Sequence, residues 1–75
     1  MPQDVLLFAG TLRENILVGM PFASDEQLLR AAKLAGVDQF ASTHPMGFDM
    51  PVGERGAALS GGQRQAVSLA RALLH

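Results

Sequence analysis

Residues 59–75 read LSGGQRQAVSLARALLH, and this stretch decides the fold because it predicts a helix with a marked beginning. Ser60 and Gln63 have the spacing of a capping box, in which each side chain accepts a hydrogen bond from a backbone N–H of the other residue. Apolar residues then recur every three or four positions, as they do on one face of a helix. The expected buried stripe is Ala66, Leu69, Ala70 and Leu73, and the expected polar stripe is Arg64, Ser68, Arg71 and His75.

The first turn of this helix suits an anion. The first backbone N–H groups of a helix lack partners within the helix and lie at the positive end of its dipole. Gly61 and Gly62 remove the side chains that would keep an anion away, although each costs about 1 kcal/mol of helix propensity relative to alanine. The alternative is an ordinary capped helix that follows a flexible turn and binds nothing. The spacing alone does not decide between the two.

Two further capping boxes predict helices in the first half of the chain. Residues 11–14 (TLRE) open a short helix that stops at Gly19 and Pro21. Residues 24–27 (SDEQ) open a longer helix, which ends at Gly36 as the residue after its last turn. In this longer helix the expected buried residues are Leu28, Ala31, Ala32 and Ala35, and the expected exposed residues are Glu26, Arg30 and Lys33, with Glu26 and Arg30 as a favourable pair one turn apart.

A third short helix is expected through Val37, Phe40 and Ala41, with Asp38 as its cap. It should end before His44, because Pro45 disfavours helical backbone in the residue ahead of it. Near the N-terminus, residues 5–8 (VLLF) predict either the end of a strand or a buried loop.

Residues 45–58 are expected to form a long loop, because prolines and glycines interrupt every pattern there and no regular element fits. Long loops in compact domains often carry function. Glu54 and Arg55 are therefore candidates for contact with a partner. The alternative is that they form a solvated charge pair in a turn.

Composition limits the remaining possibilities. A chain of 75 residues forms one small unit of marginal stability, and a net charge of −1 gives no electrostatic case for nucleic acid. Cysteine is absent, and His44 and His75 have no second ligand at useful spacing, so no metal site of its own is expected. No apolar run approaches the roughly 20 residues that span a bilayer, and no signal peptide is recognised. We expect a soluble fragment.

At three places the chain resembles ATP-binding-cassette (ABC) exporters. Residues 1–10, with Gln3, resemble their Q-loop, and residues 11–16 (TLRENI) resemble the helix that follows it. Residues 52–56 (VGERG) resemble the X-loop, and residues 59–63 (LSGGQ) resemble the signature motif. The motifs stand in the family's order and cover essentially the whole chain. Residues 65–68 (QAVS), together with residues 44–49 (HPMGFD), are most similar to the type I protein-secretion branch.

This resemblance implies a fold and a function. The fold would be a mostly α-helical subdomain of a P-loop ATPase, one unit over residues 1–75, with three to four helices and a long loop at about 45–58. The function would be to couple ATP-driven closure of two nucleotide-binding domains to export across a membrane. The alternative function is a helical protein-interaction module with no nucleotide role.

The resemblance also implies roles for particular residues. Ser60, Gly61, Gly62 and Gln63 match the motif that closes on ATP held by the opposite subunit. Gln3 matches the catalytic glutamine whose amide can reach Mg²⁺ or the attacking water. Glu54 and Arg55 match the loop that touches the coupling helices of the transmembrane domains. ATP and Mg²⁺ would thus be cofactors of the parent protein.

The chain lacks the other motifs of such an ATPase. Lys33 is the only lysine and lies within a predicted helix, so these 75 residues hold no P-loop, and the sequence stops at His75 before the place where the acidic strand motif is expected. Whether an enzyme is present is thus uncertain, and we expect the fragment alone neither to hydrolyse ATP nor to bind it tightly. Its expected partners are the ATP-binding core, a second nucleotide-binding domain and the transmembrane coupling helices, at the cytoplasmic face of the cell membrane. The fragment can also self-associate through apolar faces that normally meet the core.

Overall fold

The computed structural model describes residues 7–18, 20 and 22–74. These form four α-helices, and two short 3₁₀-helices lie between the third and the fourth. The α-helices are α1 (Leu12–Leu17), α2 (Asp25–Ala35), α3 (Val37–Ala41) and α4 (Gly61–Leu74), and the 3₁₀-helices are η1 (Gly47–Asp49) and η2 (Glu54–Gly56). Within the described residues there is no strand beyond a single bridge between Thr11 and Pro51. The mostly helical fold with three to four helices is confirmed.

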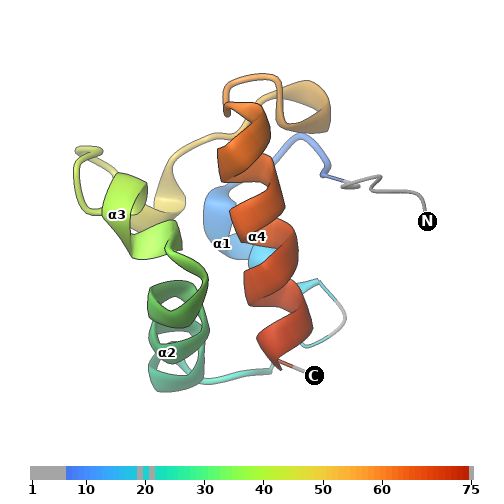
Figure 1. Ribbon diagram of the computed structural model, residues 1–75. Coiled ribbons are helices and arrows are strands. Elements are labelled where there is room, and N and C mark those ends of the chain that lie inside the picture. Colours follow the sequence, from blue (N-terminus) through green and yellow to red (C-terminus); the bar gives the residue numbers. More distant parts are fainter. Residues whose placement is uncertain (1–6, 19, 21, 75) are drawn as a thin grey trace.

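Helix α4 lies across the front of the molecule in Figure 1, with α1 behind it and α2 and α3 to one side. Its first turn is at the same end of the molecule as η2 and the segment that leads into α1. No helix within the described ranges is both long and apolar enough to cross a membrane.

All three predicted capping boxes form. At α1, the Glu14 N–H donates to Thr11 Oγ1 at 3.0 Å, and the Thr11 N–H donates to Glu14 Oε1 at 2.8 Å. The boxes that open α2 and α4 have the same two bonds, at 2.8 to 3.1 Å. Gly36 ends α2 in the left-handed region (φ 85°), as predicted. These contacts form between residues three positions apart, which is why the sequence predicts them well.

The core lies where α2 packs against α4 and α1 packs beneath both. Small side chains on α2 let the two longer helices approach closely, while larger apolar residues fill the space around α1. The apolar residues that are almost fully buried are Leu12, Ile16, Leu28, Ala31, Ala32, Val37, Ala41, Val52, Leu59, Val67 and Ala70. On the predicted buried face of α2, Leu28, Ala31 and Ala32 are buried as expected, and Ala35 is half-buried against the core.

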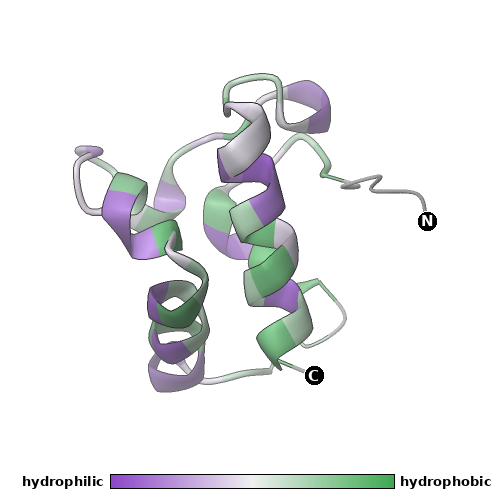
Figure 2. Ribbon diagram, viewed as in Figure 1, coloured by the Kyte–Doolittle hydropathy of each residue, from purple (hydrophilic) through white to green (hydrophobic). Residues whose placement is uncertain are grey.

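The predicted buried face of α4 is partly wrong. Ala70 is buried as expected, but Leu69 and Leu73 remain 48% and 47% exposed, and Val67 is fully buried in their place. The buried face of α4 is therefore the one that carries Val67 and Ala70. Figure 2 shows that hydrophobic residues are spread along the lower half of α4. Both stripes have helical spacing, and only the positions of α1 and α2 decide which one is covered.

Two local predictions are corrected. Helix α3 begins at Val37 after Gly36, whose left-handed backbone serves both helices, so Asp38 lies in the first turn and is not the cap. Glu26 and Arg30 are both exposed and are not among the ion pairs of the described residues. Exposed pairs of long side chains gain little from holding a single geometry, because water screens the charges.

The loop at 45–58 is also more regular than expected, since it contains η1 and η2. Its turns close through bonds such as Gly56 N–H to Gly53 O at 3.0 Å and Ala57 N–H to Glu54 O at 3.0 Å. Between the two turns, the Val52 N–H donates to Gly10 O at 3.0 Å, and the Val52 side chain is buried. The glycines that ruled out a long helix or strand instead allow two tight turns.

Candidate functional site

The first turn of α4 is open to solvent. Ser60, Gly61 and Gly62 are exposed, and Gln63 is half-buried. A Cβ atom at Gly62 would meet nothing within 4 Å, and one at Gly61 would meet only Arg64 Nη2 at 3.8 Å. Packing within this chain therefore does not require glycine at either position.

The hydrogen bonds of this turn leave groups free for a ligand. Ser60 Oγ accepts from the Gln63 N–H, and Ser60 O accepts from the Arg64 N–H. The hydroxyl proton of Ser60 and the N–H groups of Gly61 and Gly62 have no acceptor among the described residues. Three donors thus lie in one exposed turn, where only Arg64 Nη2 comes within 4 Å of a Cβ position of the two glycines, and such a turn suits an oxyanion.

Glu54 and Arg55 lie in η2, which residues 57–60 connect to α4, and both side chains are exposed. Arg55 has a left-handed backbone (φ 56°), which is uncommon for a residue other than glycine and carries a cost of order 1 kcal/mol. Figure 1 places η2 beside the first turn of α4. The two exposed candidate surfaces, at residues 54–55 and 60–63, are joined by only four residues.

A depression of about 590 Å³ lies next to η2 and is lined by Leu7, Phe8, Ala9, Glu54, Arg55 and Ala57. Its lining comes from two distant parts of the chain, the segment before α1 and the η2 region almost fifty positions later. Phe8 is 41% exposed at this place. Gln3, the predicted catalytic residue, lies outside the described residues, so its position relative to this depression is not given.

Asn15 holds the segment before α1 in place, and the sequence reasoning missed it. Its side chain is fully buried; Oδ1 accepts from the Phe8 N–H at 2.9 Å, while Nδ2 donates to Phe8 O at 3.0 Å and to Thr11 O at 2.9 Å. A signal was available, because Asn15 stands beside Ile16 on the side of α1 that the spacing predicts to be buried. Buried amides are rare unless they are bonded.

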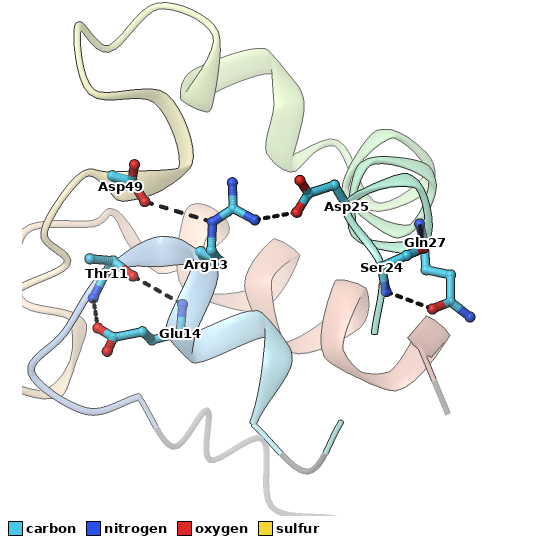
Figure 3. A network of polar contacts seen from close by, with 7 residues as sticks. All are labelled: Thr11, Arg13, Glu14, Ser24, Asp25, Gln27 and Asp49. Carbon is cyan, nitrogen blue, oxygen red and sulfur yellow. Dashed lines mark hydrogen bonds and ion pairs between the residues drawn. The ribbon is translucent and has the colours of Figure 1, made fainter. Parts of the chain in front are cut away.

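Arg13 links three elements at the exposed side of α1 (Figure 3). Its Nη1 lies 2.7 Å from Asp25 Oδ1 at the start of α2, and its Nε lies 3.7 Å from Asp49 Oδ1 in η1. Asp25 also stands in the first turn of α2, where the helix dipole favours an acidic residue. The contacts link the three elements at the surface.

Arg71, predicted to be on the polar face of α4, instead turns towards α1. Its Nε donates to Asn15 O at 3.0 Å, in the last turn of α1, where a cation is favourable. Burial lowers the pKa of the Arg71 guanidinium because desolvation disfavours the charged form. Its role is structural, since its bond joins two helices of the core.

Comparison with known proteins shows what this chain is similar to. No family model matches the chain. The chain is 51% identical over all 75 of its residues to a multidrug efflux ATP-binding/permease protein of Mycobacterium bovis (strain BCG / Pasteur 1173P2). It is also 51% identical over 73 residues to a putative multidrug export ATP-binding/permease protein of Staphylococcus aureus (strain NCTC 8325 / PS 47).

A solved structure of a bacterial Atm1-family ABC exporter with ATP bound superposes on 97% of this chain, with a TM-score of 0.91 and 45% identity. The homologues of this chain are ABC exporters. The chain spans 6% of the mycobacterial protein, 13% of the staphylococcal protein and 13% of the chain in the solved structure. It thus matches a small segment of these exporters, and the resemblance to ABC exporters noted in the sequence is confirmed at this level.

Proposed function

We propose that this chain is the helical subdomain of the nucleotide-binding domain of an ABC exporter. The observation that carries the proposal is the superposition, at a TM-score of 0.91 and 45% identity, on an exporter segment from a structure with ATP bound. The order of the three motifs in the sequence supports the same assignment. In this proposal, residues 1–10 are the Q-loop segment, residues 52–56 the X-loop and residues 59–63 the signature motif.

The first turn of α4 would close on the γ-phosphate of ATP held by the opposite subunit. The Ser60 hydroxyl and the N–H groups of Gly61 and Gly62 are donors that stabilise phosphate charge without an acid or a base. Gln63 would hold Ser60 in place through the two bonds of the capping box. The exposed glycines fit this use, because the open space above Gly62 admits a phosphate where a larger residue would collide with it.

Two other surfaces complete the proposal. The Gln3 amide would reach Mg²⁺ or the attacking water when the two subdomains rotate together. Glu54 and Arg55, with the depression beside them, would contact the coupling helices of the transmembrane domains. The partners would thus be the ATP-binding core, the second nucleotide-binding domain and the membrane part of the exporter, at the cytoplasmic face of the membrane.

The type I protein-secretion branch stays a prediction from residues 44–49 and 65–68, whereas the relatives are named as multidrug efflux or export proteins. The alternative function, a helical interaction module without a nucleotide role, would need neither free donors nor glycines at the start of α4. The flanking coding sequence separates the two, because an exporter segment requires a GK[ST] loop upstream and an apolar strand ending in Asp-Glu downstream.

The test is made in a full-length exporter that contains this chain. We expect S60R to abolish ATP-dependent closure and hydrolysis, because the larger side chain fills the phosphate site. S60D is the sharper variant: aspartate keeps the helix cap but places a negative charge where the γ-phosphate would lie, so turnover should be lost while the domain stays folded. The matched control is S42R, since Ser42 is exposed at the end of α3. Wild-type turnover in both Ser60 variants would contradict the proposal.

A further inference from the structure

We infer that Arg64 is a positioning residue that ties the η2 turn to the first turn of α4. Its Nη1 donates to Leu59 O at 3.1 Å and makes a longer contact of 3.5 Å with Gly56 O. One guanidinium on α4 therefore reaches back over the four residues that separate Arg55 from Ser60. This inference rests on the proposed function in one respect, because it joins the surface proposed for the membrane part to the surface proposed for ATP.

The stem of Arg64 makes a second contact at the same place. Gly56 is buried and has a left-handed backbone (φ 74°); a Cβ atom there would lie 2.5 Å from Leu7 Cδ1 and 3.1 Å from Arg64 Cδ. Gly56 is thus enclosed between the segment before α1 and the side chain of Arg64. If η2 moves, Gly56 pushes against the aliphatic stem of Arg64. The guanidinium of Arg64 also contacts the carbonyls of Gly56 and Leu59, which flank residues 57–58.

The covalent chain offers a competing route from η2 to α4. Ala57 and Ala58 are both exposed, so few side-chain contacts hold that part of the backbone. Leu59 is buried, and its carbonyl is the stronger of the two acceptors for Arg64. The N–H groups of Ala57, Ala58 and Leu59 donate to the carbonyls of Glu54, Val52 and Gly56 at 2.9 to 3.0 Å, so backbone bonds already shape this segment. The arginine bonds add a side-chain link between η2 and α4, immediately before the capping box.

The experiment measures whether a change at η2 reaches α4 through Arg64. The 75-residue chain is labelled with ¹⁵N, and η2 is perturbed by R55G, which removes the exposed side chain and the strain of the left-handed backbone. The amide signals of Gly61 and Gly62 are compared with and without R55G in three backgrounds, namely wild type, R64M and R30M. Methionine keeps an unbranched stem but has no donor, and Arg30 is an exposed arginine of α2 that serves as the matched control.

We expect R55G to shift the Gly61 and Gly62 amides in the wild-type and R30M backgrounds, and we expect the shift to be lost in R64M. Two results overturn the inference. If R55G shifts the two amides as much in R64M as in the wild type, the backbone carries the coupling. If R55G shifts neither amide in the wild type, there is no coupling to explain. If R64M does not fold, as judged by the signals of Ile16 and Val37, the shorter amide of R64Q replaces it with the same two outcomes. No nucleotide is used, so this result is independent of the Ser60 variants that test the proposed function.

Discussion

Asn15 of α1 bonds both backbone groups of Phe8, accepting from its N–H at 2.9 Å and donating to its carbonyl at 3.0 Å. The pattern is that of a neighbouring β-strand, supplied by one side chain. The amide nitrogen of Asn15 makes a third bond, to Thr11 O at 2.9 Å, with its second proton. This bond links Asn15 to the residue that caps α1. Three of the four hydrogen bonds that a primary amide can make are thereby directed by a fully buried side chain at the segment that leads into α1.

We predict that N15L destabilises the 75-residue chain by about 2–3 kcal/mol in urea unfolding. Leucine has a similar volume, but it leaves the N–H and the carbonyl of Phe8 without their side-chain partner, and unsatisfied groups cost about 1–3 kcal/mol in such cases. The Thr11 carbonyl keeps its bond from the backbone N–H of residue 15. N15D is the informative companion, since it keeps an acceptor for the Phe8 N–H and loses both donors. A free energy of unfolding equal to that of the wild type in N15L would show that these bonds do not hold the segment.

We predict a much smaller effect at Arg13. The pair with Asp25 is short, at 2.7 Å, but 83% of the Asp25 side chain is exposed. Exposed ion pairs contribute about 0–1 kcal/mol and weaken as salt screens them. R13M should therefore lower the free energy of unfolding by at most about 1 kcal/mol, and 1 M NaCl should remove most of the difference. A large loss that salt does not change would mean that the stem of Arg13, and not its charge, holds the three elements together.

What could be predicted from the sequence follows the range of the interactions. The capping boxes at Thr11, Ser24 and Ser60 depend on residues three positions apart, and each one forms. The buried stripe of α4 could not be derived in the same way. Val67 and Leu69 each belong to a set of apolar residues that recur at helical spacing, so the pattern alone does not tell which set is buried. Which of them is covered depends on where α1 and α2 pack, and that is set by contacts between distant parts of the chain.

The same limit applies to the candidate site. Ser60 to Gln63 form one continuous turn, so their geometry follows from the local sequence. The depression beside η2 joins residues 7–9 to residues 54–57, and the bond from Arg71 to Asn15 spans 56 positions. No pattern within a short window indicates such pairs. Gln3 lies outside the described residues, and its role stays a prediction.

We predict that G56A destabilises the chain by at least about 2 kcal/mol, since it combines a strained backbone with overpacking. Alanine at φ 74° is unfavourable, and its Cβ would lie 2.5 Å from Leu7 Cδ1. G47A is the matched control, because Gly47 also has a positive φ (55°) but a Cβ there would meet nothing within 4 Å. Thermal unfolding of the two variants separates strain, which both carry, from the contact, which only G56A has. Equal losses in both would remove the case for close packing at Gly56.

We predict that G62A has opposite effects on stability and on activity. Gly62 is exposed in the first turn of α4, and a Cβ there meets open space, so alanine should stabilise the isolated chain by up to about 1 kcal/mol through helix propensity. In a full-length exporter the added methyl group would lie where the γ-phosphate must approach, and ATP turnover should fall even though the domain is more stable. Urea unfolding of the fragment and phosphate release by the exporter measure the two effects. A protein that gains stability and keeps its turnover would show that glycine at this position serves no ligand, and α4 would then be an ordinary capped helix.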